Sequence, residues 1–217
     1  RLEQGHPVDD VLPEAFAVKV GGADPVAPTN VVVDSVARTV TLMLADAVTS
    51  GQTVKVSYTD PTTGNDTDAI QDAAGNDAFT VENQAVANDT PPVFSAAAVT
   101  GNTLVLSWSD ALDVAHIPLA NAFTVKVNNV AQAAPTAVAV DAAARTVTLT
   151  LAMAVTNGQA VSVSYADPTV GNDAAAIQNS LGNDAVSLSN QPVTNHTPPL
   201  LSSATVSGDT LVLTYSN

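Results

Sequence analysis

The chain has 217 residues, of which 46% are hydrophobic and only 12% are charged. Acidic residues outnumber Lys and Arg by 21 to 6, and the formal net charge of −15 disfavours binding to phosphate backbones and anionic lipid surfaces. The chain has no cysteine, which excludes disulfides, thiol nucleophiles and cysteine-ligated metal sites. No apolar run approaches the roughly 18 residues that a membrane helix needs. We therefore expect a folded protein that neither binds nucleic acid nor inserts into a membrane.

Alternation of apolar and polar residues predicts about seven β-strands between residues 93 and 199. In chain order we expect them at 93–99, 104–108, 123–127, 136–141, 146–151, 161–165 and 185–193. Such alternation is typical of antiparallel strands with one buried face, and the Asp, Asn, Gly and Pro residues between them favour turns. The stretches 111–121 and 174–181 break the alternation, and each has room for a helical turn. The prediction is an all-β fold, an antiparallel β-sandwich.

The chain also contains an internal repeat. Thr90-Pro91-Pro92 recurs further along the chain as Thr197-Pro198-Pro199. This spacing, the repeat offset, aligns 16–92 with 123–199 without a gap, and 47 of the 77 positions are identical. One period has the length of an immunoglobulin-like sandwich domain. We therefore predict tandem Ig-like β-sandwiches of about seven strands each.

The phase of the repeat sets the predicted domains. The paired prolines are expected to be linkers, because consecutive prolines stiffen the chain and discourage helix. Residues 1–92 are then an Ig-like repeat that lacks its first two strands, and 93–199 are a complete repeat. Residues 200–217 supply the first two strands of a following repeat, since GDTLVL at 208–213 matches GNTLVL at 101–106.

A sandwich without two of its strands exposes its core and leaves strand edges unpaired. Two hypotheses account for this phase. Either the chain is a segment of a longer array, or residues 200–217 complete the deficient sandwich of a neighbouring copy, head to tail, by strand addition. A denaturing mass measurement separates them, because a species much heavier than 21.9 kDa would remove the need for strand donation.

Four segments of the repeat resemble consecutive signatures of a known family. They are AIQDAAGND at 69–77, LVLSWSD at 104–110, FTVKVN at 123–128 and VSVSYADP at 161–168. Together they resemble the bacterial Ig-like repeat of giant surface proteins, including the cyanobacterial swimming-protein repeat. The resemblance implies an extracellular or cell-surface location and a role in stalks, adhesins or filaments, and it carries no catalytic activity.

The sequence contains no catalytic motif. Its three histidines lack metal-ligand spacing, and it has neither a Gly-x-Ser-x-Gly elbow nor a glycine-rich phosphate loop. We therefore expect a structural protein rather than an enzyme: a semi-rigid spacer or the body of a fibre. The alternative is a calcium-dependent adhesin module that binds a glycan or another surface ligand through its Asp-rich loops.

Calcium is the cofactor that these loops suggest. It takes six to eight oxygen ligands, and loops of Asp, Asn and Gly supply them. The carboxylates common to both copies are candidate ligands: Asp60, Asp66 and Asp77 in the first copy, Asp167, Asp173 and Asp184 in the second. A second candidate site lies at the predicted domain junction, with Asp89, Asp110 and Asp113. The competing interpretation is that the repeated Gly-Asn-Asp tripeptide only forms tight turns.

Overall fold

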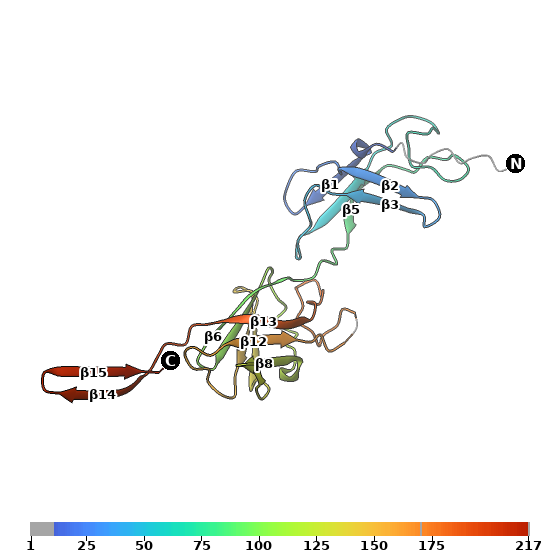
Figure 1. Cartoon of the computed structure of the whole chain (residues 1–217). Helices are drawn as coiled ribbons and strands as arrows, with labels where there is room; N and C mark the ends of the chain where they lie inside the picture. Colours follow the sequence, from blue (N-terminus) through green and yellow to red (C-terminus); the bar gives the residue numbers. More distant parts are fainter. Residues whose placement is uncertain (1–10, 170, 217) are drawn as a thin grey trace. The chain divides into compact units, whose positions relative to one another are not determined.

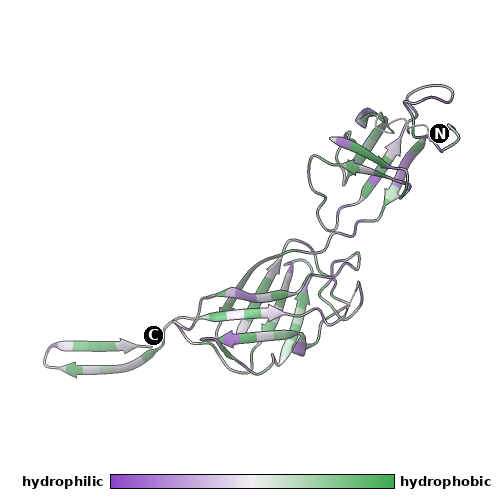
Figure 2. Ribbon diagram, turned by 45° about the vertical axis from the view of Figure 1, so that its right-hand side comes forward, coloured by the Kyte–Doolittle hydropathy of each residue, from purple (hydrophilic) through white to green (hydrophobic). Residues whose placement is uncertain are grey.

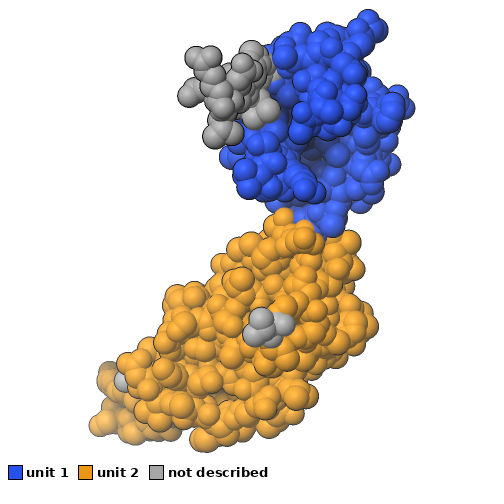
Figure 3. All heavy atoms as spheres, turned by 90° about the vertical axis from the view of Figure 1, so that its right-hand side faces the viewer, with its two compact units in different colours: residues 1–88 blue, residues 89–217 orange. Residues whose placement is uncertain are grey.

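The structure, a computed structural model, describes residues 11–169 and 171–216. Its regular elements are β-strands, apart from two short 3-10 helices at Pro13–Ala15 and Ala120–Ala122 (Figure 1). This confirms the predicted all-β fold. The chain divides into two compact units, unit 1 (1–88) and unit 2 (89–217), which are coloured separately in Figure 3. Neither 3-10 helix of the described residues has the length and apolarity to span a membrane.

Unit 2 contains an eight-stranded sandwich. Its strands are β6 (Phe94–Thr100), β7 (Thr103–Trp108), β8 (Phe123–Val127), β9 (Val130–Ala131), β10 (Ala137–Asp141), β11 (Thr146–Thr150), β12 (Val161–Tyr165) and β13 (Leu188–Asn195). They follow the order β10-β11-β7-β6-β13-β12-β8-β9. All neighbours are antiparallel except β6 and β13, which pair in parallel. The parallel pair joins two antiparallel halves, the two layers of the sandwich.

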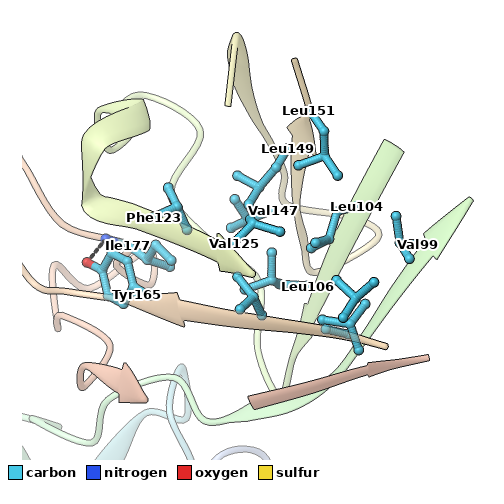
Figure 4. Close-up of a cluster of buried hydrophobic side chains, with 14 of the residues drawn as sticks. Val99, Leu104, Leu106, Phe123, Val125, Val147, Leu149, Leu151, Tyr165 and Ile177 are labelled. Atoms are coloured by element: carbon cyan, nitrogen blue, oxygen red, sulfur yellow. Dashed lines mark hydrogen bonds between the residues drawn. The ribbon is translucent and has the colours of Figure 1, made fainter. Parts of the chain in front are cut away.

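One core lies between these two layers. Apolar side chains from both converge there, among them Val99, Leu104, Leu106, Val125, Val147 and Leu149 (Figure 4). The intervening Thr and Ser residues of β11 and β12 are half-buried, so the strands alternate as predicted. Each fully buried Leu or Val contributes about 1.5–3 kcal/mol to stability. The unit is therefore held together by its hydrophobic core, without disulfides.

The chain enters and leaves this sandwich at opposite ends. β6 is its first strand and β13 its last, and they are neighbours through the pairs Ala98–Thr194 and Val99–Asn195. Because the two strands run in the same direction, the start of β6 and the end of β13 lie at opposite edges of the layers. The incoming and the outgoing chain of this sandwich therefore lie at its opposite ends.

A separate hairpin follows the sandwich. β14 (Leu201–Ser207) and β15 (Thr210–Tyr215) pair with each other in antiparallel fashion (Figure 1). Among the described residues they pair with no other strand, and every residue of both strands is exposed. Hydrophobic residues nevertheless recur along the hairpin (Figure 2). At the repeat offset, β14 corresponds to β6 and β15 to β7.

Unit 1 repeats five strands of the sandwich. They are β1 (Phe16–Val20), β2 (Asn30–Asp34), β3 (Thr39–Met43), β4 (Val54–Tyr58) and β5 (Val81–Val86), the counterparts of β8, β10, β11, β12 and β13. They form two sheets, β2-β3 and β1-β4-β5. The core is smaller, with Val11, Ala15, Phe16 and Tyr58 buried and Val40 and Leu42 only partly so.

Two details of the strand prediction are corrected. The strand β9 has two residues, too few to produce an alternating pattern, and it was not expected. Of the two stretches with room for a helical turn, the first overlaps the 3-10 helix Ala120–Ala122, whereas 174–181 contains turns and no helix.

Candidate functional site

The loop between β12 and β13 is organised around a buried tyrosine. Tyr165 ends β12, and its ring packs against Phe123 with a centroid distance of 5.4 Å. Its hydroxyl oxygen accepts the backbone N–H of Ile177 at 2.8 Å (Figure 4). Burial raises the pKa of Tyr165 to about 12, and the nearby carboxylates of Asp167, Asp184 and Asp173 act in the same direction. The hydroxyl therefore stays protonated at physiological pH and serves as an anchor for the loop.

Two carboxylates of this loop have opposite environments. Asp184 is only 9% exposed, and burial is the largest cause that raises its pKa. Its Oδ2 accepts the N–H of Asp173 at 2.9 Å, whereas Oδ1 has no hydrogen-bond partner among the described residues. The carboxylate of Asp173 accepts the Thr169 hydroxyl and the N–H of Ala175, and these bonds lower the pKa of Asp173.

Unit 1 contains the same arrangement. The Tyr58 hydroxyl accepts the N–H of Ile70 at 3.0 Å, and burial raises the pKa of Tyr58. The N–H of Asp66 lies 3.3 Å from each carboxylate oxygen of Asp77. The Thr62 hydroxyl donates to Asp66 at 2.5 Å. Both copies therefore share the tyrosine anchor and the bond between the two aspartates, but the Gln71 amide donates to Asp77 at 2.8 Å, whereas Nε2 of its counterpart Gln178 has no partner among the described residues.

The structure brings the loop candidates for calcium together in each unit. Asp60, Asp66 and Asp77 act electrostatically on Tyr58, and Asp167, Asp173 and Asp184 act on Tyr165. Within the described residues, however, no group of three or more His, Cys, Asp or Glu side chains has the geometry of a metal site. The hydrogen bonds of these carboxylates fit the role of turn formers, and calcium binding stays a prediction.

The junction candidates are engaged in local contacts. Asp113 accepts the N–H of Ala115 at 2.8 Å and lies 2.7 Å from Nδ1 of His116, and both contacts lower its pKa. Asp110 accepts the hydroxyl of the adjacent Ser109. Asp89 is exposed. Asp110 and Asp113 are thus held within their own turns.

The structure reveals a linker clamp that the sequence did not predict. The buried side chains of Asn179 and Asn183 each donate to the carbonyl oxygen of Thr90, at 3.3 Å. The side-chain oxygen Oδ1 of Asn179 accepts the backbone N–H groups of Leu181 and Asn183 at 2.9 and 3.0 Å, which fixes the orientation of the Asn179 amide. Because Thr90 precedes the buried Pro92, the loop holds the start of the linker on the sandwich of unit 2.

The two copies differ at this clamp. Asp72 of unit 1 occupies the position of Asn179, and its carboxylate accepts the N–H groups of Ala74 and Asn76. A carboxylate has no N–H with which to bind a carbonyl oxygen. Asn179 therefore supplies the donor to Thr90 that Asp72 lacks.

Unit 1 also has an open pocket that is much larger than its counterpart in unit 2. It measures about 290 Å³, and its lining includes Val18, Val26 and Leu44. The counterpart in unit 2, which includes Leu151, measures about 30 Å³. In unit 2 the turn of the β6–β7 hairpin lies at this place, since the N–H of Leu151 donates to the Asn102 carbonyl at 2.7 Å. Figure 3 shows the surface of unit 1 to be hollowed.

Comparison with known proteins identifies the repeat. The family model named SWM repeat, with the description "Putative flagellar system-associated repeat", matches residues 4–63 and 87–170, about two thirds of the chain. At the repeat offset the first match corresponds to 111–170, so the second match has an additional beginning at 87–110, which contains β6 and β7. No curated protein and no solved structure gives a significant match. The predicted resemblance is confirmed: the chain belongs to the SWM repeat family.

Proposed function

We propose that the chain is a structural repeat segment of an extracellular bacterial surface protein. Its sandwiches, joined head to tail, form a semi-rigid spacer or the body of a fibre. The observation that carries this proposal is the parallel pairing of β6 and β13, because it places the incoming and outgoing chain at opposite ends of the sandwich. A repeat built in this way adds length with every copy and needs no binding pocket.

Contacts at both ends of the sandwich support the semi-rigid character. At the incoming end, the clamp holds the carbonyl of Thr90, and Val93 exchanges hydrogen bonds with Ser109 at 3.0 and 2.8 Å. At the outgoing end, the Thr197 hydroxyl accepts the N–H of Gly101 at 2.9 Å, and its carbonyl accepts the Asn157 amide at 2.8 Å. The residues next to the paired prolines are therefore part of the folded unit, which limits bending there.

The location outside the cell is supported by membership of a flagellar system-associated repeat family. It is tested by electron microscopy of intact source cells with gold-labelled antibody raised against unit 2. We expect gold on projections from the cell surface. Labelling that appears only after the cells are permeabilised would contradict both the location and the spacer role.

A calcium-dependent adhesin is the second candidate. The observation that favours it is Oδ1 of Asp184, which has no hydrogen-bond partner among the described residues and lies in a loop where two further carboxylates act on the same tyrosine. In unit 1 three carboxylates likewise act on Tyr58, but Oδ1 of Asp77 accepts the Gln71 amide at 2.8 Å. A cation there would relieve the repulsion and stabilise the fold by binding. In this case calcium raises the melting temperature by several degrees and promotes binding to a glycan array.

The control for calcium compares two Asp-to-Asn variants. Asp184→Asn alters the loop, whereas Asp209→Asn removes the same charge from the exposed hairpin turn. Loss of the calcium effect only in Asp184→Asn supports the adhesin candidate. A melting temperature that chelator leaves unchanged in the unaltered chain excludes it.

A further inference from the structure

The hairpin β14–β15 has the side chains of a core strand pair but no core. Leu211 is 64% exposed, whereas its counterpart Leu104 in β7 is 0% exposed. Leu213 is 47% exposed, and its counterpart Leu106 is again 0% exposed. An isolated two-stranded hairpin is marginally stable in water, and a contiguous exposed apolar surface marks an interaction site.

Unit 1 has a place for such a hairpin. In unit 2 the pair β7-β6 lies between β11 and β13. The counterparts of these flanking strands, β3 and β5, each have one strand neighbour among the described residues, so one edge of each is open there. Leu42 of β3 is only partly buried, whereas its counterpart Leu149 in β11 is fully buried against β7. Within the described part of unit 1, the core is therefore open where unit 2 is closed by β6 and β7.

We propose that the hairpin at 201–215 of one copy of the chain inserts between β3 and β5 of unit 1 in a second copy. The combined strand order is β2-β3-β15-β14-β5-β4-β1, which reproduces the order in unit 2. This joint rests on the proposed head-to-tail spacer function and identifies the partner and the surface. Because donor and acceptor are different surfaces, the contact is heterologous and propagates from copy to copy.

The pairing in unit 2 predicts the register of the joint. In β11 and β7, Leu149 lies opposite Leu104 and Val147 opposite Leu106. At the repeat offset, Leu42 of one copy then lies opposite Leu211 of the other, and Val40 lies opposite Leu213. Each of the four is apolar. β14 pairs in parallel with Ala87 and Asn88, which directly follow β5, as β6 pairs with Thr194 and Asn195 at the end of β13.

The turn of the hairpin fits the open pocket of unit 1. In unit 2 the carbonyls of Gly101 and Asn102 accept the N–H groups of Val155 and Leu151. Their counterparts in the hairpin are Gly208, at a φ of +61°, and Asp209, and Gly101 has nearly the same φ of +58°. The counterpart of Leu151 is Leu44, which lines the 290 Å³ pocket. The turn of the hairpin therefore has the backbone conformation that the β6–β7 turn has at the equivalent place in unit 2.

Charge also permits the contact. Asp209 is the one charged residue between 201 and 215 in a chain of net charge −15, so the hairpin approaches another acidic copy with little repulsion.

An arginine provides a further contact between the equivalent strands of unit 2, where the guanidinium of Arg145 donates to the carbonyl of Ser109 at 2.9 Å. Arg38 and Ser216 are their counterparts. Arg38 has the same left-handed backbone as Arg145, with φ values of 59° and 58°.

The first test measures the mass of the 217-residue chain by sedimentation over a range of concentrations. We expect dimers and longer oligomers to grow with concentration. In Leu211→Asp combined with Leu213→Asp, association weakens by at least about a hundredfold because two buried side chains are lost. Val212→Asp is the matched control, since Val212 is 50% exposed and its counterpart Val105 faces away from the core; this variant still associates.

The second test mixes variants that are blocked at opposite surfaces. Val40→Asp combined with Leu42→Asp blocks the acceptor surface between β3 and β5 and leaves the hairpin intact. The chain with Leu211→Asp and Leu213→Asp has a blocked hairpin and an intact acceptor surface. Each alone is monomeric, and an equimolar mixture forms a species of twice 21.9 kDa and nothing longer. If the variant with Val40→Asp and Leu42→Asp loses the fold of unit 1, Ala47→Trp is used in its place, because Ala47 is exposed and lines the pocket that the tryptophan would fill.

The outcomes separate this inference from the proposed function. A chain that stays monomeric at every concentration overturns the joint, and so does an oligomer that survives the hairpin substitutions. Neither result touches the spacer role, which the gold labelling of cells tests. Conversely, a mixture that forms the expected pair, together with gold found only inside cells, would retain the joint and reject the surface function.

Discussion

Units 1 and 2 share much of their sequence and differ in how far their cores are closed. The segment TVTL occurs at 39–42 in β3 and at 146–149 in β11. Leu149 is fully buried because β7 covers it, whereas Leu42 is partly buried at the edge of a two-stranded sheet. Burial is therefore set by the neighbouring strands, and the same four residues contribute differently to stability in the two units.

The largest expected effect is at this leucine pair. Leu149→Ala leaves a cavity in a closed core and lowers the free energy of unfolding of unit 2 by about 2–5 kcal/mol. At a concentration at which the chain is monomeric, Leu42→Ala removes a partly exposed side chain and costs unit 1 about 1 kcal/mol or less. Chemical denaturation followed by the fluorescence of Trp108, the single tryptophan, reports on unit 2, and hydrogen exchange in β4 reports on unit 1. Equal losses in both units would contradict the difference in closure.

The linker clamp gives the next effect. Asn179→Asp removes the amide that binds Thr90 and introduces a charge at a fully buried position, which costs unit 2 about 2–3 kcal/mol. Asp72→Asn, the reverse exchange at the exposed counterpart, changes unit 1 by no more than about 0.5 kcal/mol. The loss in Asn179→Asp diminishes at acid pH, where the new carboxyl is protonated. A variant as stable as the unaltered chain would show that the clamp carries no energy.

The tyrosine anchors sharpen the comparison further. Tyr165→Phe leaves the buried N–H of Ile177 without its acceptor and lowers the stability of unit 2 by about 1–2 kcal/mol. Tyr58→Phe has the smaller effect, about 1 kcal/mol or less, because its 3.0 Å bond to Ile70 is only partly buried. The two losses are measured by the same denaturation and exchange experiments. A larger loss in unit 1 would reverse the proposed order of closure.

The smallest effect is a pH dependence of unit 2. Burial raises the pKa of Asp184 in the folded state, so folded unit 2 binds this proton more tightly than the unfolded chain. The stability of unit 2 therefore rises, through this residue, as the pH falls from above the raised pKa to the ordinary value of 3.8. Asp173 acts in the opposite sense, because its lowered pKa adds stability that is lost as the pH falls through the folded value. In Asp184→Asn the rise disappears, and an unchanged pH profile would refute its assignment.

The sandwich was predictable because alternation and repetition are local signals. The strands around Leu104 and Val147 were placed correctly from their alternation with polar residues. The repeat offset also identified the three aspartates that the two units share, and in each unit all three act on one tyrosine. The clamp between Asn179 and Thr90 was not predictable, since it joins a side chain and a carbonyl that are 89 residues apart. The parallel pairing of β6 and β13 likewise leaves no periodic trace in the sequence.

In the proposed head-to-tail joint, the hairpin of one copy closes unit 1 of the next. Hydrogen exchange of the backbone amides in β15, measured at low and high concentrations of the intact chain, tests it directly. We predict slow exchange at 211–214 only at high concentration, together with slower exchange in β3, as the two strands become neighbours. Exchange in β15 that is fast at every concentration would contradict the claim.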